Sequence, residues 1–419
     1  MDSETIHRRR WMILGIMSLS LVITLLNNVT VNVALPELSK DLGADNSELQ
    51  WIMDAYLIVF GGLLLVMGAL GDRFGRKHAL LVGLAIVGLV SALTAQYATT
   101  SEQVIGARAL MGLGAALVMP ATLSVIVVVF PPEERGKAVG VWVGMAGIGA
   151  PIGLLVGGWA VENFDWRAVF WINPPIIALA MALSVLLVPN SKDKVGSPLD
   201  LIGGALSVGA LGFVLFAIIE GPSLGWTSVG VLSLGAIGAV LTFLFVWWEM
   251  RVDHPLLPID FFRSRGFSLG LIAISLTFFV MFSFMFTQML HFQLVRERSA
   301  LEAALRFLPL PLGLMPSAAN SDRLCERFGS NNVVSFGLAI IGTAMLIFTS
   351  VDVGTPYWTL AVIFFLIGIG MGLTMAPSTT MVMDSIPHDK AGVGSATNDA
   401  SREVGGAFGI AIVGSAVNE

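Results

Sequence analysis

Three charged residues lie close together inside the last apolar stretch of this chain, and they are the first candidates for chemistry. Asp399 and Glu403 are four residues apart, so a helix places both carboxylates on one face, and Arg402 adjoins Glu403. An ionisable group in a bilayer costs about 3 kcal/mol on insertion scales, which makes such groups functional candidates. Burial and a neighbouring arginine act in opposite directions on the affinity of a carboxylate for a proton. We therefore expect Glu403 to carry a proton, with Asp399 assisting; a structural ion pair that neutralises itself is the alternative.

Two further charges, Asp54 and Arg108, lie near the starts of earlier apolar stretches. The side chain of Arg108 is long enough to reach a membrane interface, which is the alternative to a place in a central cavity. Asp54 is equally consistent with a hydrated carboxylate at a helix start and with one that faces a cavity. We include both, together with Asp399, Arg402 and Glu403, among the candidate proton-coupling residues.

The composition excludes several classes of protein. Of 419 residues, 55% are hydrophobic and only 12% are charged, which is well below the charged share of a soluble domain. The single cysteine, Cys325, excludes an internal disulfide, a cysteine-based zinc site and an iron–sulfur cluster. The net charge of -6 offers no basic surface for nucleic acid. The sequence has no catalytic constellation and no phosphate-binding loop, so we expect neither an enzyme nor a nucleotide-driven pump, and no cofactor or metal.

A membrane-crossing helix needs about 20 mostly apolar residues, and the chain has thirteen such stretches. They lie at 11–35, 50–70, 79–98, 104–130, 137–161, 168–188, 200–220, 228–248, 267–290, 301–320, 333–350, 356–378 and 391–416. Sixteen of the 23 Lys and Arg residues lie in the N-terminal arm and the loops of the same side, against four in the loops of the other side. Because basic residues mark the cytoplasmic side, the sequence predicts an all-α polytopic membrane protein with a cytoplasmic N-terminus.

Two charged loops that contain prolines divide the chain into three parts. Residues 189–199 and 249–266 are charged, contain prolines and bracket the seventh and eighth stretches. We expect an N-terminal six-helix bundle at 1–190, an inserted helix pair with its linkers at 191–265, and a C-terminal bundle at 266–419. The second loop suits an amphipathic segment on the membrane surface and a plain solvated linker equally well.

The loop after the second stretch carries small residues and paired charges. It contains Gly68, Gly71, Asp72, Arg73, Gly75, Arg76 and Lys77. The glycines allow two helices to approach closely, and a tight positively charged turn is the plain interpretation. The spacing G-x-L-x-D-R-x-G-R-K, however, resembles the cytoplasmic signature of the major facilitator superfamily, and 321–329 resembles a degenerate copy of it. The resemblance implies two six-helix bundles that alternate access around a midplane site, with this loop as a cytoplasmic gating motif.

Further motifs are similar to those of the fourteen-span drug:proton antiporters of the EmrB/QacA type. They lie at 32–36, 51–56, 107–114, 149–158, 165–173 and 398–406. The resemblance implies that the fifth stretch packs closely as an antiporter helix through Gly149, Pro151, Gly153, Gly157 and Gly158. The sequence departs from the family pattern at three points: Asn27 replaces an Asp, Gly153-Leu154 replaces Gly-Pro, and the expected last span is missing.

The resemblance implies a transporter of a bacterial inner (plasma) membrane that exports amphipathic, cationic drugs in exchange for protons. Its partners would be a small-molecule substrate, protons and the lipid bilayer, without nucleic acid or nucleotide, and it would be a monomer. We expect the substrate cavity to include Asn27, Asn32, Phe282, Phe286 and Gln288, since aromatic rings suit flat cations; for a single Phe, contact with lipid is the plainer interpretation. The alternatives are a narrow-substrate exporter of a metabolite, lipid or sugar, and an inactive or sensor-like truncated transporter.

Overall fold

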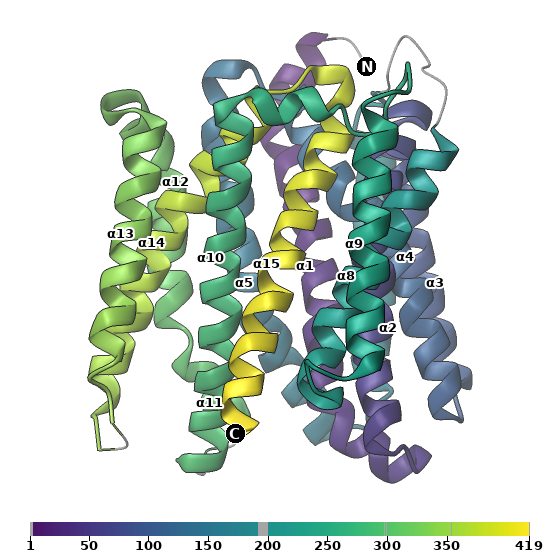
Figure 1. Ribbon diagram of the computed structural model, residues 1–419, viewed down its shortest axis with the longest axis vertical. Coiled ribbons are helices and arrows are strands. Elements are labelled where there is room, and N and C mark those ends of the chain that lie inside the picture. Colours follow the sequence, from purple (N-terminus) through teal and green to yellow (C-terminus); the bar gives the residue numbers. More distant parts are fainter. Residues whose placement is uncertain (1–2, 192–199, 297, 299, 353, 419) are drawn as a thin grey trace.

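The computed structural model describes residues 3–191, 200–296, 298, 300–352 and 354–418, and within these ranges every regular element is helical. The first part of the chain forms α1 (Ser3–Leu42), α2 (Asn46–Phe74), α3 (Arg76–Tyr97), α4 (Ser101–Val129), α5 (Pro132–Asn163), α6 (Ala168–Trp171) and α7 (Asn173–Leu187). Next come α8 (Leu201–Leu224) and α9 (Val229–Glu249). The last part forms η1 (Ile259–Arg263), α10 (Arg265–Leu290), η2 (His291–Val295), α11 (Ala300–Arg306), α12 (Pro309–Phe328), α13 (Ser330–Phe348), α14 (Tyr357–Asp384), η3 (His388–Lys390) and α15 (Ala391–Asn418). The long helices stand side by side in one bundle, with the two chain ends at opposite ends of it (Figure 1).

Local chemistry explains several helix boundaries. Asp45 caps α2, because its side chain accepts the N–H of Glu48 at 2.8 Å while the carboxylate of Glu48 accepts the N–H of Asp45 at 3.0 Å. Pro132 occupies the first turn of α5, where a missing N–H costs nothing. Gly75 and Gly329 separate α2 from α3 and α12 from α13 with φ of 113° and 83°, a region of backbone conformation that favours glycine.

The observed helices agree with the expected membrane-spanning stretches, with differences at three of them. Eleven described helices are long and apolar enough to cross a membrane. The expected stretch 391–416 corresponds to α15, whereas the expected stretch 301–320 is divided between α11 and the first part of α12, which continues to Phe328. Both α12 and α15 run along the other helices (Figure 1). They differ from the eleven because of their charges, which lie at 322–327 in α12 and at 399–403 in α15. The expected sixth span is divided at Ile172 into α6 and α7.

The two halves of the chain repeat the same pattern of helices. α3 packs against α4 as α13 packs against α14. Gly75 and Gly83 of the first half recur at the same spacing as Gly329 and Gly337 of the second. A Cβ at Gly83 would lie 2.6 Å from a carbonyl oxygen of α4, and one at Gly337 would lie 2.8 Å from a carbonyl oxygen of α14. The glycines therefore allow equivalent close contacts. They also align α3 with α13, so that Gly75 corresponds to Gly329 and Gly83 to Gly337.

The helices α8 and α9 form a pair beside the seam between the halves. They pack against each other, and α8 also contacts α2 of the first half and α15 of the second (Figure 1). The indole N–H of Trp248 donates to the carboxylate of Asp200 at 2.8 Å and joins the two helices at one end. The expected division at 1–190, 191–265 and 266–419 stays a prediction, and residues 192–199 of its first boundary lie outside the described ranges.

Candidate functional site

Arg108 of α4 is completely buried in the first half of the bundle, so its guanidinium does not extend to a surface. It lies over the ring of Tyr56 with 4.3 Å from the guanidinium carbon to the ring centroid. Its Nε donates to the carbonyl of Ile52 at 2.9 Å and its Nη1 to the carbonyl of Asn27 at 3.4 Å. This arginine therefore joins α4 to α2 and α1 inside the bundle. Asp54, on α2, is likewise buried.

The side chain of Asn27, expected in the substrate cavity, is bound within the first half. Its Oδ1 accepts a hydrogen bond from Nδ2 of Asn173 at 3.0 Å. The same amide of Asn173 lies 3.1 Å from Oγ of Ser91, and Nδ2 of Asn27 lies 3.8 Å from the sulfur of Met111. Asn27 and Asn173 thus join α1, α3 and α7 through a buried polar network.

A second buried arginine, Arg402 of α15, lies between aromatic rings from both halves. Its guanidinium carbon is 4.9 Å from the ring centroid of Trp142 on α5 and 5.4 Å from that of Phe278 on α10. Its Nη1 is 3.5 Å from Oδ1 of Asp399, so the two side chains form a buried ion pair. A cation desolvated against aromatic faces gains about 2 kcal/mol from each good contact.

Polar groups of α14 and α15 surround this ion pair. Nη2 of Arg402 lies 3.3 Å from Oγ1 of Thr379, whose hydroxyl donates to Oδ1 of Asn398 at 3.2 Å. Nδ2 of Asn398 lies 3.4 Å from Oδ1 of Asp399. Within the described part of the structure, Oδ2 of Asp399, Nε of Arg402 and Nε1 of Trp142 are buried without a hydrogen-bond partner. The network therefore leaves one acceptor and two donors for a proton, a water or a ligand.

Glu403 is less buried than its two charged neighbours and adjoins the same cluster. It is close enough to Asp399 and Arg402 of α15, and to Tyr56 of α2, for electrostatic interaction. With Asp399 and Arg402 paired, an ionised Glu403 leaves the cluster with one net negative charge. The cluster of Asp399, Arg402, Glu403 and Trp142, which we call the charge cluster, therefore contains groups from both halves and lies next to Tyr56, which is stacked on Arg108.

The residues of the expected gating motif lie at the end of α2 and the start of α3, and they join α2 to the start of α15. Oδ1 of Asp72 accepts Nε and Nη2 of Arg76 at 2.9 and 2.7 Å. Its Oδ2 accepts the backbone N–H groups of Gly392 and Val393 at 2.7 and 3.2 Å. Arg76 also donates to the carbonyl of His388 at 2.7 Å. We call these contacts the Asp72 latch, and the end of the bundle where they lie the basic face.

The other glycines and cations of this motif serve packing around the latch. A Cβ at Gly68 would lie 2.5 Å from the carbonyl oxygen of Gly392, so the backbones of α2 and α15 are nearly in contact. A Cβ at Gly71 would lie 3.4 Å from that of Ala79. Lys77 donates to the carbonyl of Val185 at 2.7 Å, and Arg73 lies over the ring of Phe74 at 5.5 Å.

A matching seam joins α5 to α12 and to the end of α14 on the same face. Nη1 of Arg135 is 2.5 Å from Oδ1 of Asp384, and the backbone N–H of Lys137 donates to the carboxylate of Asp322. A Cβ at Gly140 would meet the carbonyl of Ala318, so here too a glycine faces backbone. The pairing of Arg135, in the first turns of α5, with Asp384, at the end of α14, was not expected from the sequence, because neither residue belongs to a motif.

The glycines of the expected antiporter helix pack α5 against α1. A Cβ at Gly149, Gly153 or Gly157 would lie 3.1 to 3.2 Å from Leu25, Val29 or Thr30, respectively. No described residue lies within 4 Å of a Cβ at Gly158, so packing among the described residues does not require this glycine. The side chain of Pro151 lies outside the described part of the structure.

The aromatic residues of α10 divide between two sides of the helix. Phe282 stacks on Phe278 with ring centroids 6.0 Å apart, on the side of Arg402. Gln288 is buried, whereas Asn32 of α1 is exposed. The side chain of Phe286 lies outside the described part of the structure. Of the five expected cavity residues, Phe282 adjoins the charge cluster through Phe278, and Asn27 adjoins Arg108.

Comparison with known proteins connects this arrangement to a large family. The family described as Major Facilitator Superfamily matches residues 17–410. The chain is 32% identical over 394 residues to the methylenomycin A resistance protein of Streptomyces coelicolor, covering 94% of this chain and 82% of that protein. It is 33% identical over 413 residues to the puromycin resistance protein pur8 of Streptomyces alboniger, covering 97% and 81%. The fold is similar to the crystal structure of the human organic anion transporter MFSD10 (TETRAN), with a TM-score of 0.64, 15% sequence identity, and coverage of 99% and 94%.

Proposed function

This chain belongs to the Major Facilitator Superfamily, and on that premise we propose that it exports amphipathic, cationic drugs across a bacterial inner membrane in exchange for protons. Relatives named for resistance to methylenomycin A and to puromycin support drug export. We propose that the protein is a drug:proton antiporter of the fourteen-span type and that it acts as a monomer.

The observation that carries the proposal is the charge cluster, where groups from the two halves of the bundle meet. The paired Asp399 and Arg402 are buried, and the less buried Glu403 supplies the net charge. An ionised Glu403 attracts a cation, and a proton on the same carboxylate removes that attraction. Proton and cationic substrate then compete for one group, which is the requirement for exchange. Trp142 and Phe278 pack against the guanidinium of Arg402 and bring groups of both halves into the cluster.

The two seams of the basic face support alternating access. With the N-terminus on the cytoplasmic side, the Asp72 latch and the pair of Arg135 and Asp384 close the cytoplasmic end. Parting of these contacts opens the bundle to the cytoplasm, where Glu403 releases its proton and binds substrate. Closing them and opening the other end lets a proton displace the substrate outside. Each inward proton contributes about 2.3 kcal/mol per 100 mV of membrane potential.

The test is efflux of a cationic dye from energised cells that express this chain, with and without an uncoupler. We expect export to stop with the uncoupler and in Glu403→Gln, which cannot release a proton. The matched control is Glu162→Gln, which removes an exposed carboxylate at the far end of α5 and leaves export unchanged. Uphill export by Glu403→Gln would refute the role of Glu403, and absence of dye export by well-inserted parent protein would refute the cationic substrate.

A neutral, an anionic and a cationic fluorescent substrate of similar size distinguish the proposed substrate charge from its alternatives. Because the ionised charge cluster has a net negative charge, we expect the cationic compound to be exported fastest. Equal or faster export of the neutral or anionic compound would favour an exporter of a narrower range of metabolites.

A further inference from the structure

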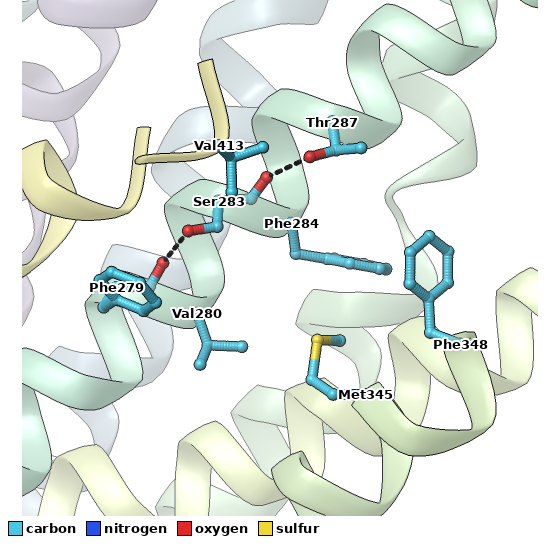
Figure 2. A pocket seen from close by; sticks show the side chains of 8 residues that line it. All are labelled: Phe279, Val280, Ser283, Phe284, Thr287, Met345, Phe348 and Val413. Atoms are coloured by element: carbon cyan, nitrogen blue, oxygen red, sulfur yellow. Dashed lines mark hydrogen bonds between the residues drawn. The ribbon is translucent and has the colours of Figure 1, made fainter. Parts of the chain in front are cut away.

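Two features lie outside the charge cluster and the seams: an apolar groove beside α10 and a pair of carboxyl groups that joins α8 to α9. The groove has a volume of about 220 Å³ (Figure 2). Its hydroxyl groups bond within α10, since Oγ of Ser283 donates to the carbonyl of Phe279 at 2.7 Å and Oγ1 of Thr287 to that of Ser283 at 2.8 Å (Figure 2). The described lining therefore leaves no hydroxyl donor free for a ligand, whereas the carboxyl pair has an unsatisfied group.

That unsatisfied group belongs to Glu249, which ends α9 and is only 3% exposed. Its Oε2 accepts the backbone N–H of Leu257 at 2.8 Å, so this carboxyl group holds the linker after α9 against the end of that helix. Its Oε1 is buried and has no hydrogen-bond partner within the described part of the structure. A buried carboxylate oxygen without a donor is destabilising, so a donor for Oε1 is missing.

The side chain that faces this oxygen is another carboxyl group, that of Asp200 at the start of α8. Oδ1 of Asp200 accepts the N–H of Gly203 at 2.8 Å, and its Oδ2 accepts the indole N–H of Trp248 at 2.8 Å. A Cβ at Gly203 would meet both Oδ2 of Asp200 and Oε1 of Glu249, so the glycine leaves room for the two oxygens side by side. The two carboxyl groups are within hydrogen-bonding reach of each other.

The surroundings supply no charge that would compensate two carboxylates. Among the described residues, no cation forms an ion pair with Asp200 or Glu249. From α2, the apolar side chain of Val66 faces Gly204 of α8, and the charges of α15 lie deeper in the bundle, in the charge cluster. The charged residues of the linker and of η1 are exposed: Arg251, Asp253, His254, Asp260 and Arg263.

We propose that Asp200 and Glu249 form a proton-binding site separate from the charge cluster, in which one proton is shared between Oδ2 of Asp200 and Oε1 of Glu249. The proton comes from the aqueous solution at the basic face. It converts one acceptor into a donor for the other and removes one of two like charges. The bound proton holds the linker at 250–258 closed on α8 and α9, where the chain leads through η1 to α10. The inference does not depend on the proposed transport activity.

A shared proton fits this site better than a metal ion does. Three of the four carboxyl oxygens already accept N–H groups, which leaves Oε1 of Glu249. Ca²⁺ and Mg²⁺ take about six or more oxygen ligands. The described residues contain no group of three or more Asp, Glu, His or Cys side chains that could hold a metal ion.

The test is hydrogen–deuterium exchange of the linker at 250–258 in the purified protein, measured by mass spectrometry at several pH values. The rates are corrected for the pH dependence of exchange in an unstructured chain. When closing is fast compared with exchange, the corrected rate is proportional to the open fraction. While the closed pair keeps its proton and the open linker has lost it, that fraction should increase by about tenfold per pH unit.

Two variants replace the shared proton by an amide. In Glu249→Gln, the NH2 group can donate to Oδ2 of Asp200 while the oxygen still accepts the N–H of Leu257. In Asp200→Asn, the oxygen still accepts the N–H of Gly203 while the NH2 group donates to Oε1 of Glu249. We expect the corrected exchange at 250–258 to be slow and independent of pH in both variants. The matched control, Asp253→Asn, neutralises an exposed carboxylate of the same linker and should keep the parental response.

The outcomes that would overturn the proposal are distinct. A pH response that survives in either amide variant would assign it to another group, such as the exposed His254, and a parental linker without a response would refute the site. If excess Mg²⁺ or Ca²⁺ slows exchange in the parent at high pH but not in Glu249→Gln, the pair binds a metal ion instead. Infrared spectroscopy is the independent measurement: the C=O band of protonated carboxyl groups should be weaker in both amide variants, and an unchanged band would contradict the shared proton.

Discussion

Replacement of Asp72 by asparagine tests whether the Asp72 latch holds the basic face closed. Asp72 is 4% exposed, and its carboxylate accepts four hydrogen bonds, two on each oxygen. An asparagine keeps one oxygen and replaces the other by an NH2 group. In either orientation that NH2 group faces two donors, from Arg76 or from the backbone of Gly392 and Val393. The variant therefore loses two hydrogen bonds and the charge that pairs with Arg76.

The size of the effect follows from burial. A hydrogen bond to a charged group contributes about 1.5–3 kcal/mol, and breaking a buried ion pair costs about 3–5 kcal/mol. Arg76 keeps its bond to the carbonyl of His388, which offsets part of the loss. We therefore expect the contact between α2 and the start of α15 to weaken by about 3 kcal/mol, which raises the ratio of open to closed basic faces by about 100-fold.

The assay is the rate at which a buried thiol near the latch reacts with a membrane-impermeant maleimide. Ser395 is fully buried two residues beyond Val393, and Ser395→Cys changes its volume little. In a Cys325→Ser background and with reagent added at the basic face, labelling requires the latch to open. When opening is fast compared with labelling, the rate is proportional to the open fraction, so Asp72→Asn should label about 100-fold faster than the parent.

A matched substitution distinguishes the latch from a general effect of lost charge. Asp260 pairs with Arg263 at 2.9 Å, but both side chains are largely exposed, and exposed pairs contribute little. Asp260→Asn should therefore label at the parental rate. Labelling of Asp72→Asn no faster than Asp260→Asn would refute the reasoning, because the buried carboxylate would then contribute nothing to closure.

Three further substitutions have defined outcomes. Gly68→Leu places a side chain against the carbonyl oxygen of Gly392, which would lie 2.5 Å from its Cβ, so the closed state should be destabilised by about 1–3 kcal/mol and the thiol at 395 should label faster. Gly106→Ala, whose Cβ has no described residue within 4 Å, should label at the parental rate, and equal rates for the two variants would contradict the close approach of α2 and α15. Trp142→Ala removes the ring 4.9 Å from Arg402 and leaves a cavity, so the protein should be destabilised by about 3–5 kcal/mol, seen as a lower melting temperature in detergent. Trp142→Phe keeps an aromatic face, so its melting temperature should decrease less, and the reverse order would refute the aromatic contact. Arg108→Lys loses the Nε bond to Ile52 and the planar stack on Tyr56 and should destabilise the protein by about 2 kcal/mol, while exposed Arg298→Lys should be neutral in the same melting experiment.

Hydropathy was sufficient to predict most of the long helices, and motif spacing indicated a close contact at 68–77. Apolar stretches of the right length became helices, because a backbone in a bilayer must satisfy its own hydrogen bonds. The glycines and charges at 68–77 indicated a tight, charged contact, and the structure adds its partner, the first turn of α15. Hydropathy described α12 and α15 less well, since both carry several charges.

The long-range partners in the site could not be predicted, because they depend on packing between segments far apart in the chain. The spacing of Asp399 and Arg402 indicated a local pair, but nothing in the sequence indicated that Trp142 would lie over Arg402. Asn27 was expected to face the cavity, and its bond to Asn173 follows only from the position of α7 against α1. Nothing in the sequence indicated that the hydroxyl group of Thr379 would be a hydrogen-bond partner of Arg402.

The seams of the basic face have a mechanical consequence. At Gly68 against Gly392, and at Gly140 against Ala318, the halves meet through glycine and backbone rather than through interlocking long side chains. Glycine and alanine have no side-chain rotamers to lose or regain, whereas each long side chain that is freed or fixed changes the free energy by about 0.5–2 kcal/mol. Separation of these seams would therefore change the side-chain conformational entropy little. The charged contacts at their ends, the Asp72 latch and the pair of Arg135 and Asp384, would hold them closed.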